Sequence, residues 1–387
     1  MLELIKAFPG DSIKSYLITP RGNIITFFKD QDIPTIKTFG ISKFDNTKYG
    51  YYKKLRWLLL IREFTYLFST IFALLRAKVK WDGIDIVHIN EITCLPTLLL
   101  AKLIFRKPII IHARAVQAKN ENPIREFAIK IILKKFSNTI IAIDKTVKSS
   151  LPDDLRIHVV HNGYRPQNTS KNDMNCVEAL REIKGNQRYL KAAIVGNLLK
   201  FKGVYEFAEA AKLCFHQKLS IKFFIVGATK KSSRGIKALI IKKMGFFHYI
   251  EDSVVNFIKE NCIDDYLHLL EFTPDIYSIY NNIDIICFPS YLNAVGRPVL
   301  EAAFFKVPSI VAINDPYDDM IIDGETGICI KEKSPQALTD AIKYFYSNPE
   351  EVKRMGEAAY QLAIKNFDIQ KNAKKLLSIY YQCIKKT

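Results

Sequence analysis

The stretch Ile283–Gly327 decides the fold, and it reads IDIICFPSYLNAVGRPVLEAAFFKVPSIVAINDPYDDMIIDGETG. Its apolar run IDIICFPS (283–290) is typical of a buried parallel strand, and VPSIVAI (307–313) predicts a second strand. Between them, PVLEAAFFK (298–306) predicts a helix with proline in its first turn. The loop 291–296 therefore follows the carboxyl end of a strand, where open α/β sheets bind their ligands.

The residues around this loop suit an anionic ligand. A helix N-terminus offers free N–H groups and a positive dipole end, which attract phosphate. Gly296 lets the backbone approach a ligand closely, and Arg297 adds a permanent positive charge. Glu301, one helical turn later, can accept hydrogen bonds from a pair of sugar hydroxyls. An ordinary βαβ crossover with a solvated Glu301 fits the local pattern equally well.

Four short motifs in this stretch resemble the donor site of the retaining family-four glycosyltransferases, which have GT-B architecture. They are Pro289-Ser290, Glu301-Ala302, Val307-Pro308-Ser309 and Asp323-Gly324-Glu325-Thr326-Gly327. The chain departs from the family eight residues before Glu301, where Asn293 replaces the usual first glutamate. The resemblance implies that Asn293 contacts the transferred sugar, although an amide cannot act as a carboxylate base or nucleophile. It also implies that backbone N–H groups at Ala294, Val295, Gly296 and Arg297 bind the donor diphosphate.

A second motif opens the C-terminal half, where YLKAAIVGNLLKFKG (189–203) is similar to the family's strand, glycine and basic loop. In the family an arginine and a lysine of this loop hold the diphosphate. Here Lys202 is retained, Asn197 stands at the arginine position, and Lys200 is the candidate replacement; a surface lysine pair beside a helix cap is the alternative. The implied donor-binding residues of this half are Gly196, Asn197, Lys200, Lys202, Gly227 at the next strand end, and Phe272 and Thr273 at the nucleobase loop.

The N-terminal half alternates apolar strands with amphipathic helices, which predicts a doubly wound parallel sheet. The expected strands are 15–19, 35–39, 85–90, 108–113, 139–144 and 157–163, and the expected helices are 2–8, about 48–80, 94–105, 123–136 and 146–151. This half resembles the acceptor domain of the same family. We therefore expect an α/β fold with two doubly wound Rossmann-like domains (GT-B).

His112 ends the fourth expected strand of this half. In the family a histidine in that loop lines the cleft near the transferred sugar, which makes His112 a catalytic candidate beside Asn293 and Arg297. A lone histidine at a strand end can equally be structural. Arg114 is a candidate partner for a phosphate or an acceptor group, and Asn90 and Glu91 are candidate acceptor contacts.

The first strand of the N-terminal domain is expected to be missing. The family opens with a strand and a glycine-rich turn, whereas this chain opens on the helix that should follow them, MLELIKAF. That strand would lie centrally in the sheet, so its loss predicts a gap there. We expect the native product to carry roughly 20 further residues upstream, the length of a strand plus a turn.

The domain boundaries follow from these patterns. We expect an acceptor-binding domain at 1–165, a polar linker at 166–188 and a nucleotide-sugar-binding domain at 189–367. In the family the final helix, here 368–387, crosses back to the first domain.

The formal net charge is +18, and residues 1–165 contribute +13 of it. A basic first half suits an anionic membrane surface, a phosphorylated lipid or nucleic acid, or else reflects a generally lysine-rich, solvated surface. No aromatic-basic nucleic-acid motif appears, which argues against that partner. The helix expected over 53–80 carries a wide apolar stripe and is either a core helix or a membrane-surface helix.

The seven cysteines are scattered without a C-x-x-C pair, and no secretory signal or metal-ligand cluster is present. These features predict a cytoplasmic protein, peripheral on the inner face of a membrane if the stripe binds lipid. The expected function is retaining transfer of a sugar from a UDP-, GDP- or ADP-sugar to a lipid-linked or oligosaccharide acceptor in surface polysaccharide synthesis, without a cofactor. The alternatives are an inactive glycosyltransferase-like binding module and a GT-B sugar-nucleotide epimerase.

Overall fold

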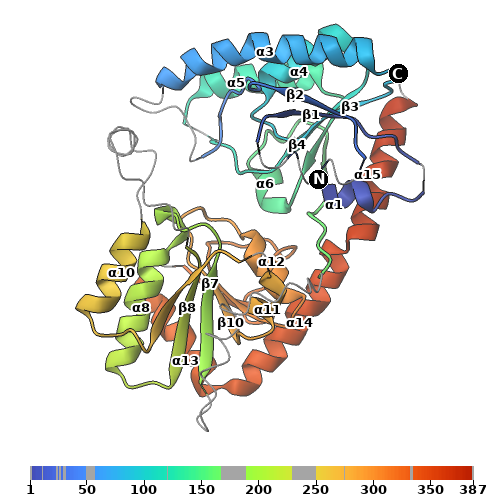
Figure 1. The fold of residues 1–387 in the computed structure, drawn as a ribbon. Coiled ribbons are helices and arrows are strands. Elements are labelled where there is room, and N and C mark those ends of the chain that lie inside the picture. The colour runs from blue at the N-terminus through green and yellow to red at the C-terminus, as the bar shows by residue number, and fades with distance from the viewer. Residues whose placement is uncertain are drawn as a thin grey trace. The chain divides into compact units, whose positions relative to one another are not determined.

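The computed structural model describes all residues except 1, 11, 23, 24, 26, 27, 29–31, 49–56, 120, 167–188, 229–249, 274, 332, 333, 386 and 387. The chain forms two compact units (Figure 1). The first comprises Met1–Tyr164 together with Asp368–Thr387, and the second comprises Arg165–Phe367. Of the linker predicted at 166–188, only residue 166 lies within the described part of the chain.

The first unit alternates strands and helices, as its sequence predicts, and every strand pair in it is parallel. Its strands are β1 (Leu17–Pro20), β2 (Thr35–Thr38), β3 (Val87–Ile89), β4 (Ile109–Ala113), β5 (Thr139–Ala142) and β6 (Ile157–Val159). Its helices are α1 (Leu2–Lys6), α3 (Leu59–Lys80), α4 (Leu95–Phe105), α5 (Pro123–Phe136), α6 (Lys145–Ser149) and α15 (Ile369–Ile384).

Helices cover both faces of the first unit's main sheet. Alternate residues of a strand point to opposite faces, and the β4 residues Ile109 and Ile111 pack with α3, α4 and α5. Ile110, between them, packs on the other face with α1 and α15. The last helix of the chain therefore completes the core of the first unit.

The sheet of the first unit is divided into two parts. Among the described residues, β1 pairs with β2 alone, while β3 is the edge of a four-stranded sheet β3-β4-β5-β6. Val87 donates its backbone N–H to Pro108 beside β4, so the backbone groups of His88 point to the open edge of β3. Residues of β1 are only half-buried, whereas β4 is buried throughout. The described strands of the first unit therefore form two separate parallel sheets.

The second unit contains one six-stranded parallel sheet in the order β12-β11-β10-β7-β8-β9. The strands are β7 (Leu190–Val195), β8 (Ile221–Ala228), β9 (Leu267–Glu271), β10 (Ile285–Phe288), β11 (Ser309–Ala312) and β12 (Gly327–Ile330). The helices are η2 (Lys200–Lys202, a 3-10 turn), α8 (Val204–His216), α10 (Ile250–Glu260), α11 (Ile276–Tyr280), α12 (Arg297–Ala303), α13 (Pro335–Ser347) and α14 (Pro349–Phe367).

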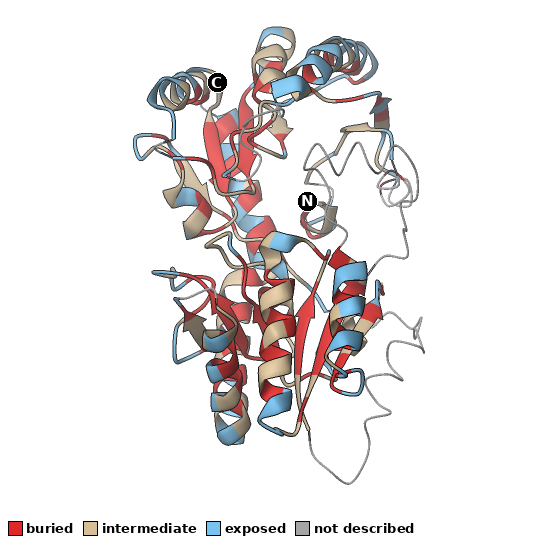
Figure 2. Cartoon of the chain, turned by 90° about the vertical axis from the view of Figure 1, so that its left-hand side faces the viewer, coloured by how far each residue is buried: buried red, intermediate tan, exposed pale blue. Residues whose placement is uncertain are grey.

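Two apolar layers enclose this sheet. Ala192 and Ile194 of β7 pack with α8, α10 and α13, whereas Ala193 and Val195 pack with α11 and α12. Figure 2 shows the central strands of the sheets buried and the outward faces of the surrounding helices exposed. Both faces of β7 and its neighbours are covered, which accounts for their continuous apolar sequences.

α3 is the longest helix of the first unit, and residues 49–56 of the predicted helix lie outside the described part. It is neither a fully buried core helix nor a solvated one. One side packs through Ala73, Leu74 and Ala77, while large apolar side chains on the other side remain exposed. No helix in the described ranges is long and apolar enough to cross a bilayer.

Candidate functional site

The predicted donor-site residues of the second unit lie at the point where its strand order reverses. The chain moves from β7 to β8 and β9 on one side of the sheet, and then returns to place β10 on the other side of β7. All these strands are parallel, so the loops after β7 and β10 leave the same edge of the sheet side by side. Ligands of doubly wound sheets bind at such a reversal.

Hydrogen bonds join these two loops. The backbone carbonyl of Phe201 accepts from the N–H of Tyr291, at 2.8 Å, and from the hydroxyl of the buried Ser290, at 3.1 Å. Gly203 stands against the second loop with φ +79°, and a Cβ placed there would lie 2.1 Å from the carbonyl oxygen of Pro289. Only glycine satisfies both the left-handed backbone and this close contact. The lysine-glycine pair and the Pro-Ser motif thus form one rigid structure.

The ammonium group of Lys202 lies over the backbone of Gly196 at the end of β7. A Cβ built on Gly196, which has φ +126°, would stand 3.2 Å from the Lys202 Nζ. No ion pair to a carboxylate is present for Lys202 in the described chain. Partial burial lowers the pKa of Lys202 because the charged form loses hydration. A partly dehydrated cation without a counter-ion is suited to receiving an anion. Asn197 and Lys200, in the same loop, are exposed.

Asn293 occupies the second loop in a left-handed conformation, φ +49°, which asparagine tolerates better than most residues. Its side-chain carbonyl accepts a 2.8 Å hydrogen bond from the backbone N–H of Asn314, just after β11. The amide therefore ties the loop to the neighbouring strand end. Ala294 and Val295 follow it and are half-buried.

The start of α12 brings two predicted residues together. Gly296 is its N-cap, and a Cβ there would collide with the ring of Phe288 at 2.2 Å. Arg297 donates from Nε to Glu301, whose side chain is 12% exposed. Tyr280, buried on α11, donates its hydroxyl to the same carboxylate at 2.9 Å. Glu301 is thus oriented by two donors on separate helices.

The remaining donor-site candidates lie at the ends of the next strands. Gly227, φ +121°, is close to the end of β8, and a Cβ there would stand 2.4 Å from the carbonyl oxygen of Gly196. Phe272 follows β9, is 64% exposed and donates its N–H to Ala228 at the end of β8. Thr273 is buried, and its hydroxyl accepts from the N–H of Asp275. An exposed aromatic ring and two close-packed glycines therefore stand along the same edge as Lys202.

His112 belongs to the first unit and is fully buried at the end of β4. Its Nδ1 lies 3.3 Å from Nε2 of His88 on β3, and Nδ1 of His88 lies 2.7 Å from the hydroxyl of Tyr380 on α15. Burial lowers the pKa of His88 to about 3 and places that of His112 well below its usual value, with the nearby Arg114 adding to both effects. Both imidazoles are therefore neutral near pH 7. Nε2 of His112 has no hydrogen-bond partner in the described structure.

Arg114 follows β4, and its side chain connects this strand end with the segments that follow β3 and β6. Its Nε donates to Asn90, at 3.0 Å to the side-chain oxygen, and its Nη1 donates to Asn162 at the same distance. Glu91, beside Asn90, accepts from the N–H of Ile92, and burial raises its pKa. The candidate acceptor residues thus gather at the carboxyl end of β3 and β4.

Three residues with evident roles escaped the sequence analysis as individual sites. His88 and Tyr380 set the hydrogen bonding of His112, and Tyr280 orients Glu301. In the family resemblance, a tyrosine stands upstream of the Pro-Ser motif at the position of Tyr280. This match could have identified Tyr280 from the sequence. His88 and Tyr380 are 292 positions apart, so no local pattern joins them.

Comparisons with known proteins agree with this geometry. Residues 177–362, which make up most of the second unit, match the family model described as "Glycosyl transferases group 1". The chain is 21% identical over 301 residues to the capsular polysaccharide biosynthesis glycosyltransferase CapM of Staphylococcus aureus, covering 74% of each chain. It is 25% identical over 235 residues to a D-inositol 3-phosphate glycosyltransferase of Corynebacterium glutamicum, covering 60% of this chain and 53% of that one.

Solved structures show the same fold along nearly the whole chain. Anabaena Alr3699/HepE in complex with UDP and glucose superposes with a TM-score of 0.68 at 16% identity, over 94% of this chain and 90% of that one. A glycosyltransferase from Rickettsia africae superposes with a TM-score of 0.71 at 17% identity, over 97% and 100%. Fold, motifs and family model coincide: the second unit matches the glycosyl transferases group 1 family, and the chain is a nucleotide-sugar glycosyltransferase of GT-B architecture.

Proposed function

We propose that the protein transfers a hexose from UDP-sugar to a hydroxyl of a lipid-linked or oligosaccharide acceptor in the synthesis of a surface polysaccharide. The observation that carries the proposal is the half-buried Lys202 ammonium at the strand-order reversal, which has no ion pair within the described residues. The UDP complexes of Anabaena Alr3699/HepE support uridine as the base. The resemblance to CapM supports a polysaccharide product.

The chemical difficulty of the reaction is the negative charge that grows on the leaving diphosphate. Lys202 and Arg297 would meet this charge as preorganised donors, together with the backbone N–H groups at 294–297. Gly196, beside the Lys202 Nζ, would leave room for the diphosphate close to the backbone, while Gly203 and Gly296 let their loops pack closely against Pro289 and Phe288. Glu301, already held by Tyr280, would accept from the ribose hydroxyls, and the exposed ring of Phe272 would face the base.

The proposed reaction proceeds on one face of the sugar. The acceptor oxygen forms a bond to the anomeric carbon as the bond to the diphosphate breaks, and the acceptor proton passes to the leaving phosphate oxygen. This step needs no carboxylate nucleophile, so it is compatible with Asn293. The first unit would bind the acceptor near Asn90, Arg114 and His112, at the cytoplasmic face of a membrane.

Ligand-dependent stabilisation tests the donor assignment. UDP at about 100-fold over its Kd should raise the free energy of unfolding by roughly 2.7 kcal/mol, and GDP and ADP at the same concentration should raise it less. Equal stabilisation by all three would refute the uridine preference, and none by any would refute the site. Transfer is tested with UDP-sugars and a lipid-linked acceptor, and NMR of the product reads its anomeric configuration.

A further inference from the structure

The outer face of the first unit carries an apolar stripe along the whole of α3. Six large side chains recur at spacings of three or four residues, which places them on one side of the helix. They are Ile61, Phe64, Phe68, Phe72, Leu75 and Val79, and their exposed fractions range from 45% to 85%. A solvated helix would carry polar side chains at these positions.

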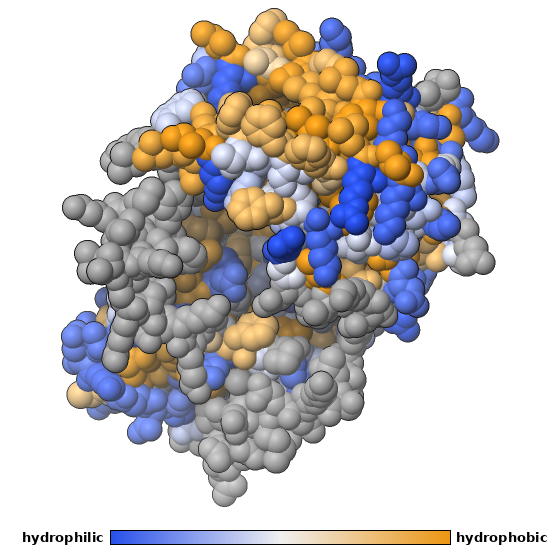
Figure 3. Space-filling model, turned by 45° about the horizontal axis from the view of Figure 1, so that its top comes forward, coloured by the Kyte–Doolittle hydropathy of each residue, from blue (hydrophilic) through white to orange (hydrophobic). Residues whose placement is uncertain are grey.

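The stripe continues across the neighbouring helices. α4 lies beside α3, and α5 lies beside α4, in one layer over the sheet (Figure 1). Leu103 of α4 is 68% exposed, and Ile124 and Phe127 of α5 are 82% and 62% exposed. Figure 3, which brings the top of Figure 1 forward, shows apolar side chains gathered into a broad surface over this layer. We call these nine residues, together with Ile131 of α5, the outer apolar face.

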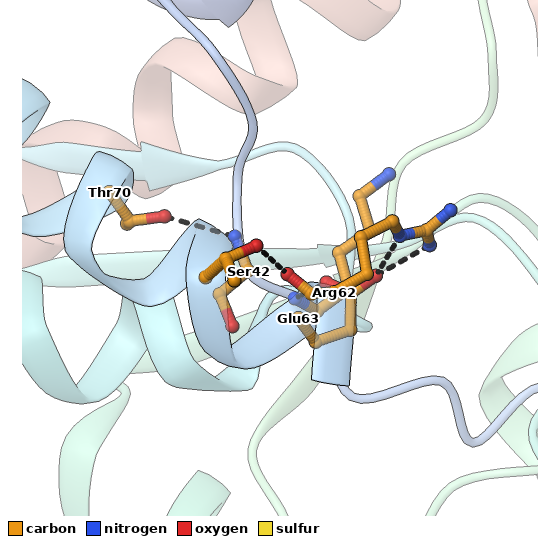
Figure 4. Close-up of polar contacts among 6 residues, drawn as sticks. Ser42, Arg62, Glu63 and Thr70 are labelled. Carbon is orange, nitrogen blue, oxygen red and sulfur yellow. Dashed lines mark hydrogen bonds and ion pairs between the residues drawn. The ribbon is translucent and has the colours of Figure 1, made fainter. Parts of the chain in front are cut away.

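The inner side of α3 is fixed, so the helix cannot turn to bury the stripe. Glu63 is buried and accepts the backbone N–H of Lys43 at 2.8 Å, and Thr70 accepts the N–H of Ser42 at 2.9 Å (Figure 4). Ser69, next to Thr70, accepts the N–H of Gly40. Rotation of α3 would break these bonds and leave the buried carboxylate of Glu63 with only its ion pair to Arg62 of the same helix, which is unfavourable.

Cations outnumber anions around the outer apolar face, although the exposed Asp82 and Glu121 lie beside the ends of α3 and α5. Exposed cations lie on or at the ends of the three helices: Arg76, Lys80, Arg106, Lys107 and Lys135. The three helices contain two acidic residues, Glu63, which is buried, and Glu126. Two copies of the chain meeting through this face would place like charges together. An anionic surface with an apolar interior complements both features.

We propose that the outer apolar face docks the protein on an anionic phospholipid bilayer, with α3 lying in the plane of the interface. The phenylalanines of α3 enter the boundary between headgroups and acyl chains, and the flanking lysines and arginines contact lipid phosphates. The inference does not depend on the identity of the donor or on transfer activity. It places the first unit, the acceptor side of the proposed function, at the membrane.

Vesicle binding tests this proposal with the full chain. The parent should bind phosphatidylcholine vesicles that contain phosphatidylglycerol, and salt should weaken the binding. The triple variant Phe64→Gln, Phe68→Gln, Phe72→Gln should bind at least about 10-fold more weakly, because three buried rings are lost. The pair Arg106→Gln, Lys107→Gln should lose about 5-fold per cation on anionic vesicles.

Matched variants separate docking from loss of structure. Phe215→Gln with Tyr344→Gln removes two exposed aromatic residues of the second unit, 37% and 43% exposed, and should leave vesicle binding unchanged. Circular dichroism and UDP binding should be the same in all variants, since the altered residues lie outside the donor site.

Three outcomes would overturn the inference. The first is a parent that does not bind the vesicles that contain phosphatidylglycerol. The second is a triple variant that binds as well as the parent. The third is a parent that does not bind lipid and is dimeric by light scattering, together with a triple variant that is monomeric. The outer apolar face would then be an interface between two copies of the chain.

Discussion

Replacing Lys202 with methionine should affect donor binding and stability in opposite directions. Methionine keeps much of the length of the side chain but removes the charge. A hydrogen bond to a charged group contributes about 1.5–3 kcal/mol, so the Kd for UDP should rise roughly 10- to 150-fold. The same change removes a partly dehydrated cation that has no carboxylate partner in the described structure. The unliganded variant should therefore be as stable as the parent or more stable.

The pH dependence follows from the direction of the pKa shift. Burial places the folded-state pKa of Lys202 below its value in the unfolded chain. The destabilisation by the charged form is complete below the folded-state pKa, and it is lost as pH rises through that pKa toward the unfolded value. Over this alkaline pH range, the free energy of unfolding of the parent should increase relative to that of the Lys202→Met variant.

Calorimetric UDP titration and urea unfolding without ligand measure the two effects. Lys259→Met, which removes one exposed charge from α10, is the control and should change neither quantity much. A Lys202→Met protein that binds UDP like the parent would show that the ammonium does not contact the donor. A variant that loses both binding and stability would show that Lys202 mainly supports the fold.

Three further predictions concern single positions. Asn293→Ala should lower kcat about 10-fold or more, and an equal kcat in the parent and this variant would contradict a contact between Asn293 and the sugar. Asn293→Asp keeps an oxygen that can accept the Asn314 N–H, so its urea unfolding midpoint should equal that of the parent. Because burial lowers the pKa of His88 to about 3 in the folded state, the free energy of unfolding should fall as pH drops from about 6.5 towards 3. The loss should be at most about 1.4 kcal/mol per pH unit for each buried histidine. Urea unfolding of His88→Leu should show a smaller dependence on pH. Gly324→Ala should cost about 1–2 kcal/mol for its left-handed φ alone, and Gly203→Ala, which also meets the Pro289 carbonyl, should cost clearly more; equal losses in thermal unfolding would show that the loops adjust freely.

The sequence alone was sufficient to predict the α/β fold class and most of the succession of strands and helices. The helix predicted at 123–136 matches α5, because its proline, N-cap and apolar spacing are local signals. Strand ends were predicted less well: the strand expected at 157–163 ends at Val159. Glycines at strand ends and the Lys202-Gly203 pair were named from the family resemblance, and their positive φ values show the backbone constraint that glycine meets.

The strand order, and with it the composition of the donor site, was decided by tertiary structure. Nothing local requires β10 to pair with β7, yet this pairing brings Ser290 and Phe201 together, 89 positions apart. The same holds for Tyr280 and Glu301. Such contacts depend on which faces of distant segments are packed against each other.

The role of the apolar stripe on α3 shows the limit most clearly. A spacing of three and four residues predicts an apolar face, but a core helix and a membrane-surface helix share that spacing. The structure shows that the inner side of α3 is occupied by Glu63, Thr70 and their backbone partners, so Phe64, Phe68 and Phe72 are left outside. The sequence shows which side chains are apolar, whereas only the packing of distant segments determines which of them are buried inside the protein.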